Sequence, residues 1–407
     1  MEDWKTYKFT ELCTLIGGGT PKTSVASYWD GDIPWLSVKD FGNDEKYVYS
    51  TEKHISEAGL KNSSTKLLKR GDIIISARGT VGAMAVIHHP MAFNQSCFGI
   101  RANELVDADF LYYLTKTKIT ELQKNSHGSV FDTITRDTFE KISCTIPCIE
   151  VQKKIAVTLS SIDDKIALNN RINHNLEEQA QALYKSWFVD FEPFKGGKFV
   201  DSELGLIPEG WSVVSAEDIC PINIGKTPPR KESEWFSAKD EDYTWVSISD
   251  MSNCGTYIDA SSETLTPEAV RKFNIAIVPA GSVLLSFKLT IGRVAIADKD
   301  LTTNEAIARF VTNNSALTDY LYLALKDYDY SKLGSTSSIA TAVNSKIIRA
   351  MPLLYPGSCV INEFAGIVEG MFKEIRKRQS ENRILADMRD FALPRLMSGD
   401  KLPFVTC

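Results

Sequence analysis

Residues 150–188 read EVQKKIAVTLSSIDDKIALNNRINHNLEEQAQALYKSWF, a stretch without glycine or proline. Apolar residues and two asparagines recur in it at alternating steps of four and three, which is the heptad spacing of a coiled coil. These positions are Ile155, Leu159, Ile162, Ile166, Asn169, Asn173, Leu176, Ala180, Leu183 and Trp187. A helix over this stretch is about 58 Å long at about 1.5 Å per residue. Because a small domain needs no helix of that length, we predict that it is a spacer.

A second stretch repeats this spacing 209 positions later. Its positions are Phe364, Val368, Met371, Ile375, Arg378, Asn382, Leu385, Arg389, Ala392 and Leu396. Asn173 and Asn382 occupy the same place in the two seams. A buried asparagine lowers stability but disfavours wrong registers, because an unpaired amide in a seam is costly. The match favours two helices that pair as a coiled coil, over the alternative of two surface helices that each pack on their own domain.

The rest of the chain is also repeated, which is the most informative feature of the sequence. Trp4 matches Trp211, 207 positions later. Residues 33–40, IPWLSVKD, match residues 243–250, YTWVSISD, 210 positions later. A near-constant offset over most of the chain is hard to obtain by chance, so we predict two copies of one domain.

Each copy has the same order of expected elements. Residues 73–76 and 283–286 are apolar runs bounded by turn residues, which predicts buried strands. Residues 109–118 and 318–328 have the spacing of short amphipathic helices. Short strands, turns and a helix in each copy indicate a mixed α/β domain.

Length and composition bound the class of protein. The 407 residues are 43% hydrophobic and 24% charged, which is typical of a globular protein of two or three domains. We expect no signal peptide and no membrane span, because no apolar run is long enough. The eight cysteines form no C-x-x-C pair, so we expect reduced, mostly structural thiols, no metal site and a cytoplasmic protein.

The formal net charge of −6 is a weak argument against nucleic-acid binding. Local charge matters more, because phosphate contacts depend on the field near the cation. Residues 61–90 carry five lysines and arginines, and their only acidic residue is Asp72. A basic face can therefore exist on this acidic chain, although an ordinary solvated surface is the alternative.

Motifs for catalysis are missing from the sequence. A methyltransferase needs an N-P-P-Y-like motif and a glycine-rich cofactor loop, and neither is present. Residues 17–23, GGGTPKT, have Pro21 where a phosphate-binding loop has glycine, so we interpret them as a turn. Residues 40–42, DFG, match a kinase metal motif, but no other kinase motif accompanies them and the second copy has DMS.

Histidine also argues against catalysis. All five histidines lie in the first copy, so a task common to both copies does not use histidine as a general base. They are His54, His88, His89, His127 and His174.

Three segments resemble a known family, the specificity subunits of type I restriction–modification systems. Residues 182–194, ALYKSWFVDFEPF, and 205–211, GLIPEGW, resemble its central conserved region, and residues 385–399, LADMRDFALPRLMSG, resemble its distal one. The G-x-T-P and P-W-x-S elements resemble its target-recognition domains.

The resemblance implies an α/β (α+β) fold of two repeated mixed α/β target-recognition domains separated by two long antiparallel coiled-coil helices. We expect the first recognition domain over residues 1–147 and the second over 197–356. The central spacer helix is expected over 148–196, and the distal spacer helix with a C-terminal tail over 357–407.

The implied role is to read DNA for a larger complex. Each recognition domain would bind one half of a bipartite, asymmetric site in double-stranded DNA, and the helices would set the gap between the halves. The helices would also dock two modification subunits, which bind S-adenosylmethionine and methylate adenine. Restriction subunits would add cleavage driven by ATP and Mg²⁺. The chain itself would hold no cofactor, metal or catalytic residue. The alternative is a non-catalytic assembly scaffold with weak or lost DNA reading; a single-chain nuclease or methyltransferase lacks its motifs.

Side chains that suit base edges and phosphates recur at equivalent loop positions of the two copies. The candidate DNA-binding residues are Thr20, Lys22, Ser37, Lys39, Arg78, Thr80, Asn94, Gln95, Lys226, Thr227, Ser247, Ser249, Lys288, Thr290 and Asn304. Arg78 and Lys288 either contact phosphate or are ordinary surface cations. Asn94 and Asn304 either read adenine or form buried turns. Positions that differ, such as Gln95 and Glu305, are better candidates for reading different half-sites.

Overall fold

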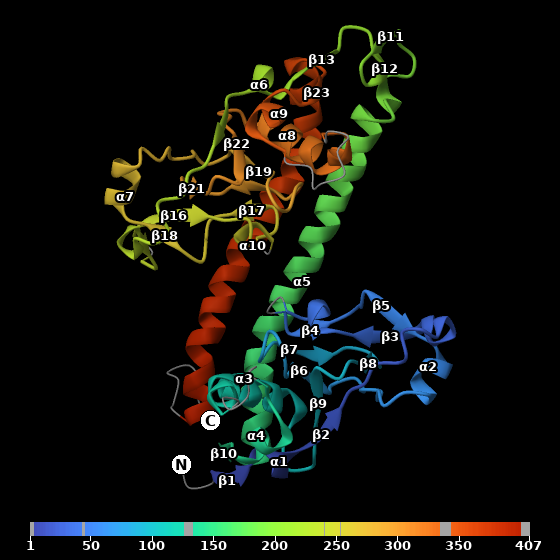
Figure 1. Cartoon of the computed structure of the whole chain (residues 1–407), viewed down its shortest axis with the longest axis vertical. Coiled ribbons are helices and arrows are strands. Elements are labelled where there is room, and N and C mark those ends of the chain that lie inside the picture. Colours follow the sequence, from blue (N-terminus) through green and yellow to red (C-terminus); the bar gives the residue numbers. More distant parts are fainter. Residues whose placement is uncertain are drawn as a thin grey trace. The chain divides into compact units, whose positions relative to one another are not determined.

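The computed structural model describes residues 4–42, 45–125, 133–239, 241–252, 254–333 and 343–399. His127, Cys407 and the tail from residue 400 onward lie outside this set. The chain forms two compact units, unit 1 with residues 1–169 and 381–407 and unit 2 with residues 170–380. Each unit takes part of both long helices, α5 (Ile149–Phe188) and α10 (Ser358–Ser398) (Figure 1). The domain boundaries at residues 147, 196 and 356 stay predictions.

Unit 1 is built on a five-stranded sheet of order β2-β9-β6-β7-β4. Its strands are β2 (Cys13–Gly17), β9 (Cys97–Ala102), β6 (Ile73–Ser76), β7 (Met84–Ile87) and β4 (Tyr47–Val48). A second sheet joins β5 (Lys53–Ile55), β3 (Trp29–Leu36) and β8 (Ala92–Phe93), and β1 (Lys5–Lys8) pairs with β10 (Ser143–Ile146). The helices are α1 (Phe9–Leu12), α2 (Glu57–Lys61), α3 (Ala108–Lys124) and α4 (Arg136–Glu140), with short 3₁₀ turns η1 (Ala26–Tyr28) and η2 (Val38–Asp40).

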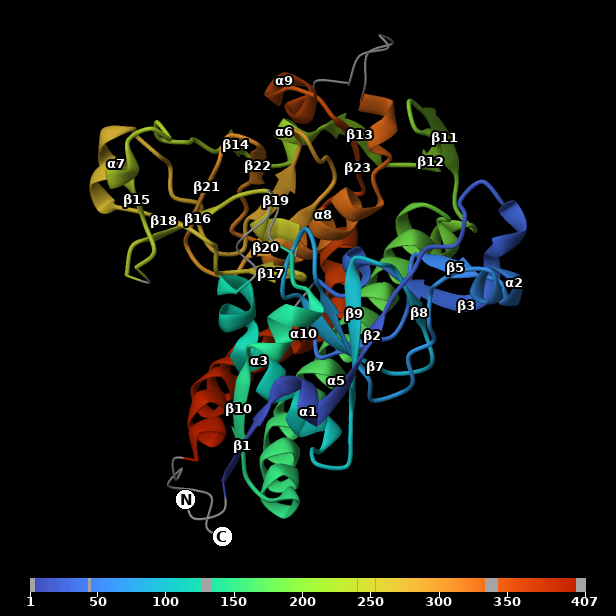
Figure 2. The same ribbon diagram turned by 60° about the horizontal axis from the view of Figure 1, so that its bottom comes forward.

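Unit 2 repeats this order around a sheet β14-β22-β19-β20-β17. Its strands are β14 (Ile222–Ile224), β22 (Ile307–Phe310), β19 (Val283–Ser286), β20 (Val294–Ala297) and β17 (Tyr257–Ile258). The second sheet is β15 (Phe236–Ser237), β18 (Thr264–Leu265), β16 (Tyr243–Val246) and β21 (Thr302–Thr303), which lie side by side in Figure 2. β13 (Ser212–Ser215) pairs with β23 (Pro352–Tyr355) as β1 does with β10. The predicted repetition of a mixed α/β domain is confirmed.

Unit 2 also carries the remaining elements. A hairpin of β11 (Phe199–Ser202) and β12 (Gly205–Pro208) follows α5. The helices are α6 (Ala216–Ile219), α7 (Pro267–Lys272), α8 (Ser315–Asp327) and α9 (Ser345–Arg349). The 3₁₀ turns are η3 (Glu192–Phe194), η4 (Ser233–Trp235), η5 (Asp250–Ser252) and η6 (Tyr330–Leu333).

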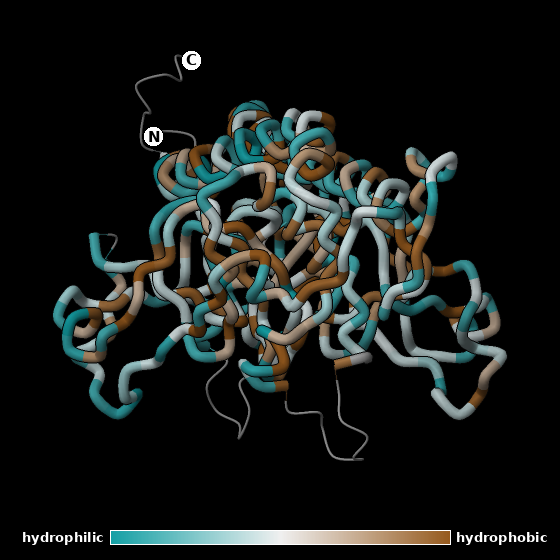
Figure 3. Tube along the Cα trace, turned by 90° about the horizontal axis from the view of Figure 1, so that it is seen from above, coloured by the Kyte–Doolittle hydropathy of each residue, from teal (hydrophilic) through white to brown (hydrophobic). Residues whose placement is uncertain are grey.

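The two predicted strands coincide with β6 and β19, and all eight of their residues are buried. The two predicted amphipathic helices are α3 and α8, but both are longer and more buried than expected. Residues 318–325 of α8 are buried without interruption. The cause is that helix α8 packs in a core that includes strands of the sheet and both long helices of its unit. Figure 3 shows how hydrophobic and hydrophilic stretches follow one another along the trace.

The long helices pair with each other in antiparallel fashion, as predicted. In unit 1, Asp163 of α5 forms an ion pair with Arg389 of α10 at 2.9 Å. In unit 2, the ring of Phe188 lies edge-on against Phe364, with centroids 4.9 Å apart. All the predicted seam positions of both helices are buried or half-buried. The alternative of two unpaired surface helices is therefore wrong.

Asn382, the seam asparagine of α10, bonds to Asn169 and not to Asn173, the equivalent residue of α5. Asn382 accepts a hydrogen bond from Asn169, at 2.8 Å, and Asn169 also donates to Glu381 at 2.8 Å. The side-chain oxygen of Asn173 is buried without a hydrogen-bond partner among the described residues. The physical reason is that residue numbers rise along one helix as they fall along the facing part of the other, so Asn169 and not Asn173 lies opposite Asn382.

Candidate nucleic-acid interface

A tight turn joins β6 to β7 in unit 1 and β19 to β20 in unit 2. In unit 1 the hydroxyl of Ser76 donates to the carbonyl of Thr80. In unit 2 the hydroxyl of Ser286 donates to the carbonyl of Thr290 at 2.7 Å. Both serines are fully buried at the end of a central strand, so each turn is fastened to the sheet.

The tips of these two turns present the predicted cations. Arg78 and Lys288 are exposed, as are Thr80 and Thr290. Neither cation forms a hydrogen bond or ion pair within the described part of the chain; the Lys288 ammonium lies 5.8 Å from the ring of Phe287. The structure therefore leaves both charges available to an external anion.

Asn94 and Asn304 shape the next turn of each unit. The side-chain oxygen of Asn94 accepts the backbone N–H of Ser96 at 3.1 Å. That of Asn304 accepts the backbone N–H of Ala306 at 3.0 Å. Each asparagine is half-buried, and its side chain closes a turn by bonding to the backbone two residues on, which supports the turn-forming alternative.

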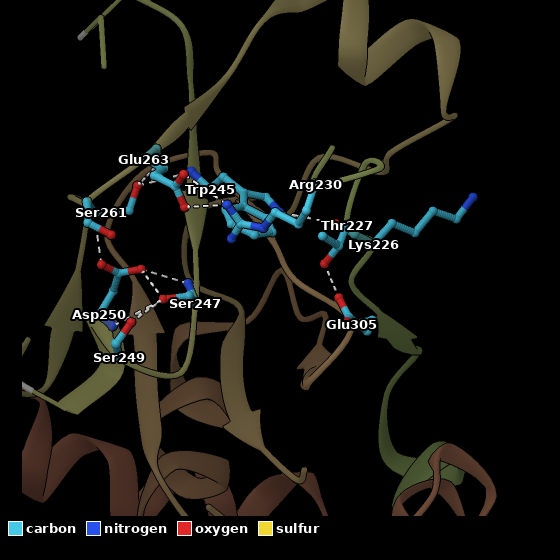
Figure 4. Close-up of polar contacts among 11 residues, drawn as sticks. Lys226, Thr227, Arg230, Trp245, Ser247, Ser249, Asp250, Ser261, Glu263 and Glu305 are labelled. Carbon is cyan, nitrogen blue, oxygen red and sulfur yellow. Dashed lines mark hydrogen bonds and ion pairs between the residues drawn. The ribbon is translucent and has the colours of Figure 1, made fainter. Parts of the chain in front are cut away.

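The neighbouring residues, Gln95 and Glu305, are exposed, and each accepts an equivalent hydrogen bond from a threonine of its own unit. The hydroxyl of Thr20 donates to the side-chain oxygen of Gln95. The hydroxyl of Thr227 donates to the carboxylate of Glu305 (Figure 4). An amide offers both a donor and an acceptor, whereas a carboxylate only accepts. Equal geometry with unequal chemistry is the feature expected where two domains read different sequences.

The predicted serines are engaged within their own loops. The backbone N–H and hydroxyl of Ser37 both donate to Asp40, at 2.7 and 2.8 Å. Those of Ser247 donate to Asp250 at 2.8 and 2.6 Å (Figure 4). The hydroxyl of Ser249 lies 2.7 Å from that of Ser247. Ser37 and Ser247 therefore stabilise their own loops. The two copies share the Ser-x-x-Asp pattern because the aspartate accepts both bonds from the serine.

The predicted lysines have different surroundings. Lys22 and Lys39 are exposed. The ammonium of Lys226 donates to the carbonyls of Phe273 and Asn274, at 3.3 and 3.0 Å, and so ties its loop to the end of α7. Lys226 is thus partly used inside unit 2.

Sequence reasoning missed Arg230. Its guanidinium lies over the rings of Phe236 and Trp245, 4.4 and 4.5 Å from their centroids. One of its nitrogens also contacts both carboxylate oxygens of Glu263, at 2.9 and 2.8 Å (Figure 4). Because this charge is already paired, we assign it to holding the loop. No spacing joins Arg230 to Glu263, so the sequence carried no signal for the pair.

A buried polar network in unit 1 was also missed. Lys46, 4% exposed, donates to Asp109 at 2.8 Å and to Ser160 on α5 at 2.7 Å. The hydroxyl of Tyr113 donates to Asp163 on α5 at 2.5 Å. Burial and the Asp163 carboxylate raise the pKa of Tyr113, so it stays a proton donor. Lys46 and Tyr113 thus tie this domain to α5. Removing a partner of a buried charge leaves that charge unpaired, which is costly, so these bonds favour one placement of the domain on the helix.

Unit 2 anchors its domain on both helices with other residues. Glu177 on α5 accepts the hydroxyl of Tyr322 at 2.5 Å and pairs with Lys326 at 2.9 Å. Gln379 on α10 donates to the carbonyl of Cys254 at 2.7 Å. The candidate loops of each unit are therefore carried by a domain that is fastened to the helices of that unit.

The described residues also bear on metal, membrane and thiol chemistry. They contain no group of three His, Cys, Asp or Glu side chains that could hold a metal ion. Among them, no helix is long and apolar enough to cross a membrane. Burial raises the pKa of five thiols to about 11 or 12, which disfavours the reactive thiolate. These are Cys13, Cys97, Cys144, Cys220 and Cys254.

Comparison with known proteins finds one family throughout the repeat. The model of the type I restriction modification DNA specificity domain matches residues 1–178 and 208–361. The MjaIX specificity subunit of Methanocaldococcus jannaschii is 31% identical, over 98% of this chain and 94% of that protein. The HindI specificity subunit of Haemophilus influenzae is 24% identical, over 98% and 100%. The solved S subunit of M. genitalium has the same fold, with a TM-score of 0.54 and 14% identity over 99% and 97% of the two chains.

Proposed function

The chain belongs to the family of type I restriction–modification specificity subunits, and from this we propose that each unit binds one half of a bipartite, asymmetric site in double-stranded DNA. The observation that carries the proposal is the pair of equivalent loops with the same internal bonds and different exposed side chains. Thr20 holds an amide at Gln95, whereas Thr227 holds a carboxylate at Glu305. One scaffold used twice with different chemistry suits two different half-sites.

The chemistry of the loops divides into two kinds of contact. Arg78 and Lys288, exposed at the turn tips, suit phosphate. Gln95 can accept from adenine N6 and donate to adenine N7, since its oxygen has a second lone pair beside the one used by Thr20. Glu305 can only accept and therefore suits the amino group of cytosine. We propose that these two residues read bases and that the two cations position the duplex.

Exposed apolar residues on the long helix α10 support a second kind of partner. Ile384, Met388 and Phe391 on α10 follow one another by four and three residues and are 59%, 55% and 59% exposed. Three large apolar side chains on one face of a helix suit docking of another helix. We propose that two modification subunits dock on the helices, and that these subunits bind S-adenosylmethionine and methylate adenine. Restriction subunits would bind ATP and Mg²⁺, and this chain would take no part in the chemistry.

Reconstitution tests the proposal. The purified chain alone should transfer no methyl group, and adding its modification subunits should restore transfer to specific sites. The assembled complex should retain its DNA, and retention should weaken steeply with salt because phosphate contacts release counterions. Methyl transfer by the chain alone would contradict the proposal. A complex that assembles but does not retain DNA would favour the scaffold alternative.

A further inference from the structure

Leu289 stands at the tip of the β19–β20 turn in an unusual state. Its backbone φ is 62°, in the left-handed region that side chains other than glycine disfavour. Its side chain is fully exposed, at a relative exposure of 103%. A large apolar residue that meets both penalties at once needs an explanation outside the stability of the fold.

Two other residues of the chain show how unusual this is. Phe191 also has a positive φ, 54°, but its ring packs on Phe199 and Trp211 with centroids 5.8 and 5.7 Å away. Gly79 occupies the equivalent tip in unit 1, at φ 77°, and has no side chain to strain. At Leu289 neither burial nor glycine relieves the backbone.

The turn that carries Leu289 is firmly held. Besides the bond from Ser286 to Thr290, the backbone N–H of Arg293 donates to the hydroxyl of Ser286 at 3.0 Å. The guanidinium of Arg293 donates to the carbonyl of Ile248 at 2.6 Å. These bonds point the tip in one direction, so the exposed side chain is presented rather than left loose.

The surroundings indicate which ligand meets this tip. Lys288 precedes Leu289 and is an exposed cation without an ion pair among the described residues, which favours a polyanion. β19 and β20 are inner strands of a five-stranded sheet, so only the turn between them can reach a groove of DNA. In the major groove the C5 methyl of thymine is the apolar group on display. We infer that Leu289 contacts the methyl group of one thymine in the second half-site. This inference rests on the proposed function, since it requires that the turn meets DNA.

The test compares thymine with uracil, which lacks that methyl group. The reconstituted complex is titrated with duplexes of its own site in which each thymine is replaced in turn by uracil. Adenine methylation requires an A·T pair in each half-site, so a thymine is present to replace. For the unaltered protein, one replacement in the second half-site should weaken binding about three- to tenfold, because a buried methyl contact is lost.

The variant Leu289→Gly supplies the matched protein. It gives unit 2 the residue that unit 1 has at the equivalent position, and it relieves the backbone, so the melting temperature should stay the same or rise. It should bind the thymine duplex about as weakly as the unaltered protein binds the uracil one, and it should ignore the replacement. Leu289→Asn, which tolerates the left-handed region but is polar, should behave in the same way.

The remaining outcomes separate the two proposals. If the unaltered protein retains its specific DNA but no uracil replacement in the second half-site weakens it, the methyl contact is wrong. The inference would also be overturned, in favour of insertion between base pairs, if Leu289→Gly bound the uracil duplex more weakly than the unaltered protein does, by the same factor as on the thymine duplex. Absence of any sequence-specific retention by the unaltered complex would instead defeat the proposed function, and the inference with it.

Discussion

At the scale of single residues, the two units share a hydrogen bond in their loops but differ in the side chain that accepts it. Gln95 and Glu305 each accept a hydrogen bond from a threonine of the first loop of their unit. The threonine sets the position of the side chain, and the residue type sets what it can recognise. This arrangement makes the exchange of amide and carboxylate a direct test of base reading.

We predict that Gln95→Glu moves one position of the first half-site from adenine towards cytosine and leaves the second half-site unchanged. The discrimination at stake is about 1–3 kcal/mol, the usual value for a good base-edge contact. The measurement is the methylated motif in whole-genome methylation data. Thr20→Val is the control, since it keeps the amide but removes its hydroxyl partner and should only weaken the preference. An unchanged first half-site in Gln95→Glu would remove this residue from the readers.

A second prediction at this scale concerns Asp319 of α8, which is 6% exposed. Burial, and next the Glu369 carboxylate, raise its pKa to about 7, while Lys373 lowers it. In the unfolded chain an aspartate titrates near a pKa of about 3.9. Between about pH 4 and pH 7 the folded state therefore holds more protons, so the contribution of this residue to stability falls as the pH rises and levels off above about 7.

Asp319→Asn should remove that dependence, because the amide does not titrate. The variant should gain stability relative to the unaltered protein as the pH rises from 5 to 8, by a few kcal/mol at most since about 1.4 kcal/mol corresponds to one unit of pKa. Urea unfolding across this range measures the difference. A difference that is constant with pH would mean that the carboxyl is not protonated in the fold.

At the scale of elements, the two long helices constrain each other's length. The chain passes between the units twice, at residues 169–170 in α5 and at 380–381 in α10. The helices pair in antiparallel fashion within each unit, so a change of length in one helix alone is opposed by the other. We therefore expect the gap between the two half-sites to change freely only when both helices change in length together.

Inserting four helix-forming residues after Asn170 and four after Ser380 should therefore lengthen the non-specific gap by one or two base pairs. Four residues add about 6 Å of helix and keep the seam roughly in phase, and DNA rises about 3.4 Å per base pair. Both half-site sequences should stay the same in the methylome. Three glycines at each place should blur the gap instead, since each glycine costs about 1 kcal/mol relative to alanine. If the helical insertions left the gap unaltered, the helices would not set the distance between the half-sites.

At the scale of the whole molecule, the repeat divides the chain into two similar units. Each unit has its own hydrophobic core, and each core includes residues of the long helices. In unit 1 the contact with α5 includes the buried Lys46, which bonds to Ser160. A transplanted domain must supply a matching cation to sit on this helix in the same way.

We predict that replacing residues 1–147 with the first domain of another family member changes one half-site only. A donor with lysine at the position of Lys46 should give a stable chimera. The same donor with that lysine changed to methionine is the control for anchoring: it should keep its half-site but blur the gap. The methylated motif of each chimera is the measurement. A change in both half-sites would show that the domains do not read independently.

Much of the fold was predictable because it follows from local patterns. The heptad seams predicted two paired helices, and the apolar runs at 73–76 and 283–286 predicted the central strands. The offset between the copies predicted equivalent loops. Periodicity and repetition are properties of neighbouring residues, so they can be recognised before the chain is folded.

The candidate site was predictable only as a set of loops. The turn role of Asn94 was one of two alternatives that the sequence offered, whereas the use of Ser37 by Asp40 and the threonine bond to Gln95 depend on backbone positions that loops adopt in the folded domain. The repeated Ser-x-x-Asp pattern at Ser37 and Ser247 was a signal for the local cap that could have been used.

By itself, the sequence determined the repeat, the mixed α/β class of each copy and the two long helices, because hydrophobic spacing and turn residues act over short distances along the chain. Tertiary structure alone decided which asparagine meets Asn382, which carboxylate pairs with Arg230 and that Leu289 is strained and exposed. Those results depend on contacts between residues far apart in sequence and on the backbone angles of a turn held by the sheet. No spacing along the chain encodes them, since they arise only when the elements pack.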